Sequence, residues 1–221
     1  MRLRHIPGAA EAVAAHPLVF DEQAALRQKG RWHQAFAADN EAEPAEGLLP
    51  LHLEIGMGRG RFLLAAAAAD PRINFLGLEK REEIVLQALE RIKNKRQPAN
   101  LRILWLDVCR LPEIFAPGEV EHIYLHFPDP WPKARHAKRR LTAPGFVAVY
   151  RAIMAPGGIL TLKTDNAPLF AWSQETFAAD QWQALRIEES IAQEETGIVS
   201  EYEGRYRRQG KPIYLAEWRI K

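Results

Sequence analysis

The chain has 221 residues, enough for one sizeable domain with a short extension or for two small domains. Its composition, 47% hydrophobic and 26% charged, is ordinary for a globular protein. The net charge is only +2, so any surface for a polyanion must be local. The single cysteine, Cys109, excludes an intramolecular disulfide, and the longest apolar run, 62–69, is too short to span a bilayer. The N-terminus lacks the apolar core of a signal peptide, so we expect a cytoplasmic protein with no membrane partner.

The first 48 residues differ in pattern from the rest. They carry scattered basic residues and then an acidic stretch, so we expect a partly ordered N-terminal arm over 1–48 and a compact domain over 49–221. Short apolar runs of that domain predict strands at 51–56, 73–79, 101–107, 120–127, 157–165, 183–191 and 212–220. Amphipathic stretches between them predict helices at 60–70, 81–96, 143–154 and 167–179.

Alternation of strands and helices is typical of an α/β fold, in which helices cover both faces of a mostly parallel sheet. The last two predicted strands are separated by 192–211, where no clear helical pattern is present. We therefore expect these two strands to form an antiparallel pair at one edge of the sheet.

A glycine-rich turn, EIGMGRG, follows the first predicted strand and opens a helix. Gly56 and Gly58 permit a tight turn and Gly60 permits close packing of the helix, so that a cofactor can lie against bare backbone. The third glycine comes one place early for a dinucleotide site, and Glu54 suits a positively charged ligand better than a pyrophosphate. S-adenosylmethionine carries a sulfonium and an ammonium group and no phosphate, and we expect it to be the cofactor.

Acidic residues end three successive strands: Glu54, Glu79 and Asp107. Glu79 is placed to bind ribose hydroxyls, and Asp107 could meet the adenine side of the pocket. A single acid at a strand end is commonly a solvated turn residue or a helix cap. Three of them, at the sheet edge where ligands bind, favour a cofactor pocket.

The stretch HFPDPWPKARHAKRR, residues 126–140, follows the fourth predicted strand. Its three prolines stiffen the backbone and fix the directions of Asp129 and Trp131. A planar base could stack on Trp131 or Phe127 while Asp129 accepts hydrogen bonds from it. No acid interrupts the basic residues that follow, which favours a polyanionic partner over a solvated charged loop.

These motifs also carry a resemblance. FPDPWPKARHAKRR, with LEIGMGRG upstream and KTDN and SEYEGRY downstream, resembles the bacterial tRNA (guanine-N7-)-methyltransferase family over nearly the whole chain. The resemblance implies a Rossmann-like class I S-adenosylmethionine-dependent methyltransferase with a seven-stranded, mostly parallel sheet and an antiparallel edge strand. It implies methyl transfer to N7 of the guanine at position 46, in the variable loop of tRNA, without a metal. The arm over 1–48 could also contact RNA, and the protein is expected to be a monomer or a homodimer.

The resemblance assigns site residues by matching motifs. It makes Asp129 the catalytic residue and places it in the cofactor pocket with the acids Glu54, Glu79 and Asp107 and the glycines Gly56, Gly58 and Gly60. It assigns substrate binding to Lys133, Asp165, Ser200, Glu201, Tyr202 and Glu203. It assigns RNA binding to Arg135, His136, Lys138, Arg139 and Arg140. The family's threonine-x-aromatic-glutamate motif appears here with Ser200 first, and serine keeps the hydroxyl.

Guanine N7 has a lone pair and no proton, so its methylation requires alignment with the donor and no general base. Guanine N1–H and the N2 amino group are donors that suit a carboxylate, and we expect Asp129, Asp165 or Glu203 to hold that edge. The alternative is a class I methyltransferase acting on another RNA or on a small molecule, which would not need tRNA.

Two other classes fit less well. An oxidoreductase with a nicotinamide cofactor is disfavoured by Glu54 and Arg61, and a non-catalytic RNA-binding module would leave the acids at the strand ends without a purpose. His122 and His126 lie on one face of a strand without a third metal ligand at suitable spacing, so they are expected to be core or interface residues.

Overall fold

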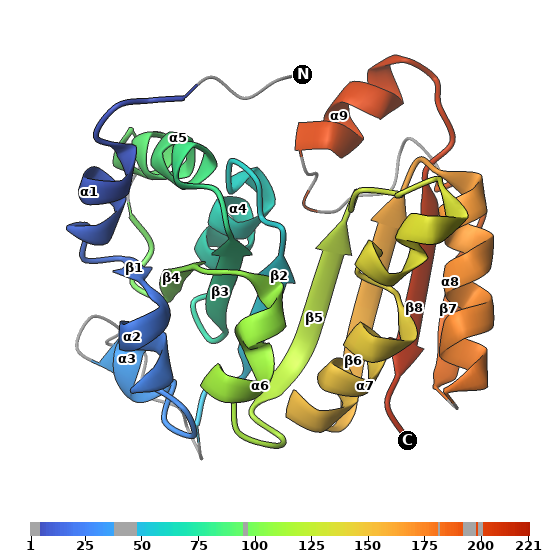
Figure 1. Ribbon diagram of the computed structural model, residues 1–221, viewed down its shortest axis with the longest axis horizontal. Coiled ribbons are helices and arrows are strands. Elements are labelled where there is room, and N and C mark those ends of the chain that lie inside the picture. The colour runs from blue at the N-terminus through green and yellow to red at the C-terminus, as the bar shows by residue number, and fades with distance from the viewer. Residues whose placement is uncertain (1–4, 38–47, 95–96, 181, 192–197, 199–200) are drawn as a thin grey trace. The chain divides into compact units, whose positions relative to one another are not determined.

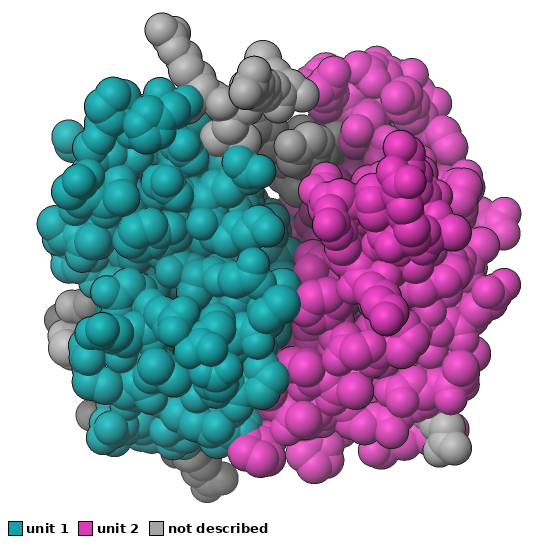
Figure 2. Space-filling model, in the orientation of Figure 1, with its two compact units in different colours: residues 1–116 teal, residues 117–221 magenta. Residues whose placement is uncertain are grey.

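The computed structural model describes residues 5–37, 48–94, 97–180, 182–191, 198 and 201–221. The chain divides into two compact units, residues 1–116 and residues 117–221, which Figure 2 distinguishes by colour. Four strands belong to each unit. Among the described residues, no helix is long and apolar enough to cross a membrane.

The first unit is built on parallel strands in the order β1 (Val19–Phe20), β4 (Leu101–Trp105), β3 (Asn74–Glu79) and β2 (Leu51–Ile55). Strands β2, β3 and β4 are almost continuously buried, as parallel strands with both faces covered must be. Their registers align Leu53 with Leu76 and Gly77 with Ile103. Because neighbouring strands run in one direction, their carboxyl ends meet at one edge, where the predicted acids lie.

Helices of the first unit form around this sheet (Figure 1). They are α1 (Ala9–Ala14), α2 (Glu22–Leu26), α3 (Gln34–Ala37), α4 (Arg61–Ala69), α5 (Glu82–Lys93), the 3₁₀ helix η1 (Val108–Arg110) and α6 (Leu111–Ile114). Helix α5 buries Val85, Ala88, Leu89 and Ile92, which recur at helical spacing. Acids in its first turn and cations in its last turn interact favourably with the helix macrodipole and stabilise the helix.

Residues 5–37 pack into the first unit through aromatic and polar contacts. Trp32 is fully buried, with its ring centroid 5.4 Å from that of Phe20, and its indole N–H donates to the carbonyl of Ile114 at 3.0 Å. Arg102, in β4, donates from Nε to the carbonyl of Ala35 at 3.0 Å and lies over the Phe36 ring. The expected division into an arm and a domain at residue 48 stays a prediction.

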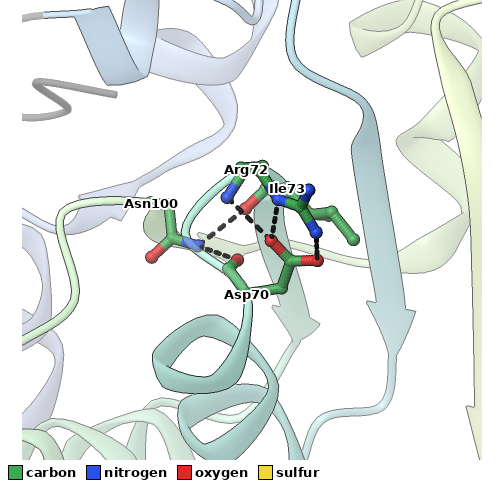
Figure 3. Close-up of polar contacts among 4 residues, drawn as sticks. All are labelled: Asp70, Arg72, Ile73 and Asn100. Carbon is green, nitrogen blue, oxygen red and sulfur yellow. Dashed lines mark hydrogen bonds and ion pairs between the residues drawn. The ribbon is translucent and has the colours of Figure 1, made fainter. Parts of the chain in front are cut away.

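The turn between α4 and β3 is held by a compact polar network, which Figure 3 shows. Asp70 accepts from the backbone N–H of Arg72 at 3.0 Å and from both ends of its guanidinium at 3.1 Å. The buried amide of Asn100 donates to the carbonyls of Asp70 at 3.0 Å and Ile73 at 2.7 Å. The loops that precede β3 and β4 are thereby joined at the amino ends of these strands.

The second unit has strands in the order β5 (Val120–His126), β6 (Met154–Thr164), β8 (Tyr214–Arg219) and β7 (Gln183–Glu188). Strand β5 is parallel to β6, and β8 is antiparallel to both of its neighbours. Its helices are η2 (Ala134–Arg139), α7 (Pro144–Ile153), α8 (Ala167–Ala179) and α9 (Glu201–Arg208). In its core, Phe177 of α8 stacks on Trp218 of β8 at 4.1 Å between centroids.

The predicted α/β class is confirmed, with mostly parallel pairing and an antiparallel pair, β7 and β8, at an edge. Three details were wrong. The described residues contain eight strands and not seven, because β1 has only two residues and no recognisable pattern. Strand β6 begins at Met154, ahead of the expected 157, and α7 ends there. The segment expected to lack a helix contains α9, whose sequence EYEGRYRR has no apolar stripe.

Candidate functional site

The glycine turn lies at the carboxyl end of β2 and has the open backbone that the sequence predicts. Gly56, Gly58 and Gly60 all have left-handed φ angles, of 76°, 56° and 65°. A Cβ atom added at Gly56 or Gly58 would meet nothing within 4 Å, whereas one at Gly60 would lie 3.5 Å from Ala88 of α5. The first two glycines thus leave bare backbone facing open space, and the third brings α4 close to α5.

A fourth glycine, Gly77 of β3, packs closely against this turn and was not part of the sequence prediction. A Cβ added at Gly77 of β3 would collide with the side chains of Leu63 and Met57. The turn also hydrogen-bonds to β3, because the backbone N–H groups of Gly56 and Met57 donate to the carbonyl of Leu78 at 2.8 and 3.0 Å. Close contact with β3 therefore fixes the path of the turn.

Glu54 lies within β2, just before the turn, and its side chain is only 3% exposed. Burial raises the pKa of this carboxyl well above its ordinary value, because the ionised form loses its hydration. A cation bound beside it would favour ionisation, so Glu54 is suited to a positively charged ligand.

Glu79 is the last residue of β3 and Asp107 lies two residues beyond β4, and the two acids differ in environment. The half-buried Glu79 accepts from the backbone N–H groups of Lys80 at 2.9 Å and Arg81 at 3.1 Å, and burial nevertheless raises its pKa. Asp107 is exposed and caps η1 by accepting from the N–H of Cys109 at 2.9 Å, which lowers its pKa. The Asp107 carboxylate thus serves as a helix cap, and its expected contact with adenine stays a prediction.

These groups fit S-adenosylmethionine by their chemistry. A buried acid suits a cationic group, a fixed carboxylate at the next strand end suits vicinal hydroxyls, and two glycines leave backbone open to close approach. All of them belong to the first unit. Asp129 belongs to the second unit, and its expected part in the cofactor pocket stays a prediction.

Asp129 is exposed on the loop that follows β5, between two residues of unusual backbone conformation. Phe127 and Trp131 have φ angles of 51° and 41°, a left-handed region that aromatic residues rarely adopt. Phe127 donates its N–H to the carbonyl of Lys163 at 2.7 Å, and its ring lies 5.5 Å from that of Tyr206 in α9. The loop is therefore anchored on β6 and α9 before it reaches Asp129.

The Trp131 ring already has intramolecular contacts. The Arg139 guanidinium lies 5.0 Å above it, and the His136 ring meets it edge-on at 5.7 Å between centroids. Arg140 donates to the carbonyls of Pro130 and Trp131. Four of the predicted RNA- or substrate-binding cations are exposed on or beside η2: Lys133, Arg135, Lys138 and Arg139.

Glu203, predicted to bind substrate, is 1% exposed and lies between two cations. Its Oε2 accepts from Lys163 Nζ of β6 at 3.0 Å, and its Oε1 accepts from Arg207 Nη2, one turn along α9, at 2.6 Å. Figure 1 shows α9 beyond the carboxyl end of β6, where this network joins the two elements. Asp165 is half-buried just after β6.

The same motif also contains Ser200, Glu201 and Tyr202. Ser200 lies outside the described residues, and Glu201 and Tyr202 begin α9 with side chains that are not described. Lys163 and Arg207 were not predicted as site residues. The spacing of Glu203 and Arg207 is a helical i,i+4 signal that could have indicated their pair, whereas nothing local indicates Lys163.

The two histidines of β5 are placed within the sheet. His126 is buried, and desolvation lowers its pKa to about 3. His122 is half-buried, stacks on Tyr124, and shares a 2.8 Å hydrogen bond with the Thr161 hydroxyl. Within the described part of the chain, no group of three or more histidine, cysteine or acidic residues is arranged to hold a metal ion.

Comparison with known proteins gives consistent matches. The family model described as "Putative methyltransferase" matches residues 49–216. A curated tRNA (guanine-N(7)-)-methyltransferase of Brevibacillus brevis is 41% identical over 98% of this chain and 97% of its own length. One of Lachnoclostridium phytofermentans, with the same name, is 39% identical over 97% and 96%.

Solved structures show the same fold at low identity. A 16S rRNA methyltransferase, KamB, has a TM-score of 0.63 at 15% identity and covers 85% of this chain and 93% of its own. A SAM-dependent methyltransferase from Aquifex aeolicus has a TM-score of 0.55 at 14% identity, with 78% and 82% covered.

The fold and the glycine turn thus define a Rossmann-like methyltransferase, as the sequence predicts. The family follows from the curated relatives, which match almost from end to end at 34–41% identity. The chain belongs to the bacterial tRNA (guanine-N7-)-methyltransferase family.

Proposed function

We propose that the protein transfers a methyl group from S-adenosylmethionine to N7 of the guanine at position 46, in the variable loop of tRNA. The observation that carries the proposal is membership of the family over nearly the whole chain. The open glycine turn and the buried Glu54 support the choice of donor, because together they offer close backbone approach and a group suited to positive charge.

S-adenosylmethionine supplies an electrophilic methyl group on its sulfonium sulfur. The residues proposed to bind it are Gly56, Gly58 and Gly60 of the turn and the acids Glu54, Glu79, Asp107 and Asp129. Glu54 balances positive charge from within the sheet, and Glu79 is held by backbone N–H groups in a fixed orientation. These residues therefore offer orientation and charge balance to the donor.

Asp129 is proposed to be the catalytic residue, acting by position and charge. Guanine N7 has no proton to remove, so the contribution of the protein is to align the base with the methyl group. The methylated ring is cationic, and a carboxylate nearby stabilises the charge as it develops. An exposed carboxylate on a loop anchored at both ends is suited to both tasks.

The guanine edge is proposed to be held by Asp129 or Asp165. The third candidate, Glu203, has each carboxylate oxygen engaged by a cation. Its proposed part in substrate binding is therefore indirect: it holds α9, which begins with Glu201 and Tyr202 of the same motif. Lys133, Arg135, Lys138 and Arg139 are exposed near Asp129 in sequence and are proposed to contact phosphates, with His136 beside them.

The decisive experiment is incubation of the protein with unmodified tRNA and methyl-labelled donor, followed by mapping of the modified base. Label at N7 of guanine 46 is expected, and replacement of that guanine by adenine should abolish incorporation. Label elsewhere in the tRNA would overturn the position, and no label in tRNA would favour a methyltransferase acting on another RNA or on a small molecule.

Asp129→Asn tests the catalytic assignment. The variant should lose about 100- to 1000-fold in kcat, because it removes the charge that the cationic product requires. Circular dichroism and thermal melting should match the wild type, since the side chain is exposed. Glu175→Gln, at an exposed carboxylate of α8, is the matched control and should keep full turnover; near-normal turnover of Asp129→Asn would refute the assignment.

A further inference from the structure

Arg140 occupies a different environment from the cations that precede it. Its Nε donates to the carbonyl of Pro130 at 3.2 Å and its Nη2 donates to the carbonyl of Trp131 at 3.3 Å. The face of the guanidinium lies 4.5 Å from the ring centroid of Trp172 in α8. This cation is therefore half-buried between the Asp129 loop and a helix of the core, and two of its nitrogens donate to backbone carbonyls of that loop.

The two carbonyls that Arg140 binds belong to the residues that come immediately after Asp129 in the chain. Trp131 has a φ of 41°, and a bulky residue stays in such a conformation only where surrounding contacts hold it. On the other side of Asp129, the Phe127 N–H is bound to the carbonyl of Lys163 at 2.7 Å. Asp129 thus lies between two fixed points, of which Arg140 provides the second.

The geometry uses properties that are specific to arginine. A planar guanidinium can donate to two carbonyls and stack on an indole at the same time, whereas a lysine ammonium is a single flexible point charge. A phosphate contact through Nε would break its bond to the carbonyl of Pro130, whereas the side chains of Arg135 and Lys138 are exposed.

We propose that Arg140 is a positioning residue for Asp129 and not a contact to RNA phosphate. The proposal rests on the proposed function, in which Asp129 aligns the guanine. Loss of the clamp would let the backbone at Trp131 relax from its strained conformation and displace Asp129, while the exposed side chains of Arg135 and Lys138, which do not pack on Trp131, stay available to bind tRNA.

Arg140→Lys and Arg140→Ala test this proposal, with Arg151→Lys as the matched control at an arginine that pairs with Asp180 on the outside of α7. Both Arg140 variants should lower kcat by about 10- to 100-fold, the loss expected from a small misplacement of a catalytic group. The Kd for tRNA and the slope of its logarithm against the logarithm of salt concentration should stay at the wild-type values. Millimolar guanidinium should partly restore kcat of Arg140→Ala beyond the effect of the same concentration of potassium ions.

Amide hydrogen exchange of 127–138 separates the clamp from the reaction. Faster exchange there in the Arg140 variants, and not in Arg151→Lys, is expected. Unchanged exchange, unchanged kcat, or a salt slope reduced by about one with kcat intact would each overturn the proposal. If the wild type failed to methylate tRNA while the exchange difference persisted, the proposed function would be wrong and the clamp itself would stand.

Discussion

Glu54 is a residue whose charged form opposes folding and which is proposed to bind the donor. Its side chain is buried in β2, and burial raises its pKa because the folded protein disfavours the charged form. The folded state therefore holds this proton more tightly than the unfolded chain does. As pH rises from the ordinary value of 4.5 through the raised pKa, the contribution of Glu54 to stability is progressively lost.

Glu54→Gln should separate these two effects. At neutral pH the variant should have a higher free energy of unfolding than the wild type, and the difference should disappear below the ordinary glutamate pKa of 4.5. Donor affinity should fall by about 10- to 100-fold, because a charge-assisted interaction of roughly 1.5–3 kcal/mol is removed. Urea unfolding at several pH values and calorimetric titration with the donor measure both; equal stability at neutral pH would contradict the argument.

The sequence singles out candidate site residues, whereas their environments could not be predicted from it. Glu54 and Asp129 stand in recognisable motifs, but only the structure shows that one is buried and the other exposed. Arg140 belongs to the same basic run as Arg139 and Lys138, and its different role depends on Trp172, a residue of another helix. Contacts between distant residues leave no local pattern, so such differences are not visible in the sequence.

At the scale of elements, α9 is held by buried charge pairs together with the packing of one aromatic side chain. Glu203 is buried between Lys163 of β6 and Arg207 of its own helix, and Tyr206 packs against Phe127. Helices of this length are marginal without tertiary contacts, which explains why the polar sequence did not predict it. Helix α5 and strands β2 to β4 have strong periodic or continuous apolar patterns, and the sequence predicted them well.

Glu203→Gln should destabilise the protein by about 2–3 kcal/mol, because two largely buried cations lose their shared countercharge. Increased hydrogen exchange over α9 should accompany the loss. Glu188→Gln breaks a partly exposed ion pair with Arg186 and should cost less than about 1 kcal/mol. Comparable losses from the two substitutions, measured by urea unfolding, would show that the Glu203 network contributes no more than a surface pair.

At the scale of the whole molecule, charge is nearly balanced. The chain has 30 lysines and arginines against 28 acids, so its net charge of +2 provides little general attraction for RNA. Affinity for tRNA must then depend on a few local cations. The exposed residues on and beside η2 are the group that the proposed function assigns to this role.

The double variant Arg135→Ala/Lys138→Ala should weaken tRNA binding and reduce the slope of log K against log salt by about 1 to 2. Turnover at saturating tRNA should change little, since neither side chain is proposed to align the guanine. Lys93→Ala/Lys221→Ala removes the same formal charge at exposed positions outside 133–140 and should leave the slope unchanged. Equal reductions in both double variants would indicate a diffuse electrostatic attraction and no local RNA-binding surface.

The left-handed conformations of Phe127 and Trp131 have a consequence for how this enzyme could be altered. Selection for heat resistance rewards mutations that relieve local strain, and residues tolerant of such backbone angles would be favoured at these two places. The same mutations would loosen the segment that carries Asp129. Laboratory evolution toward thermotolerance should therefore exclude residues 126–140 from mutagenesis. Otherwise we expect variants with a higher melting temperature and a lower kcat.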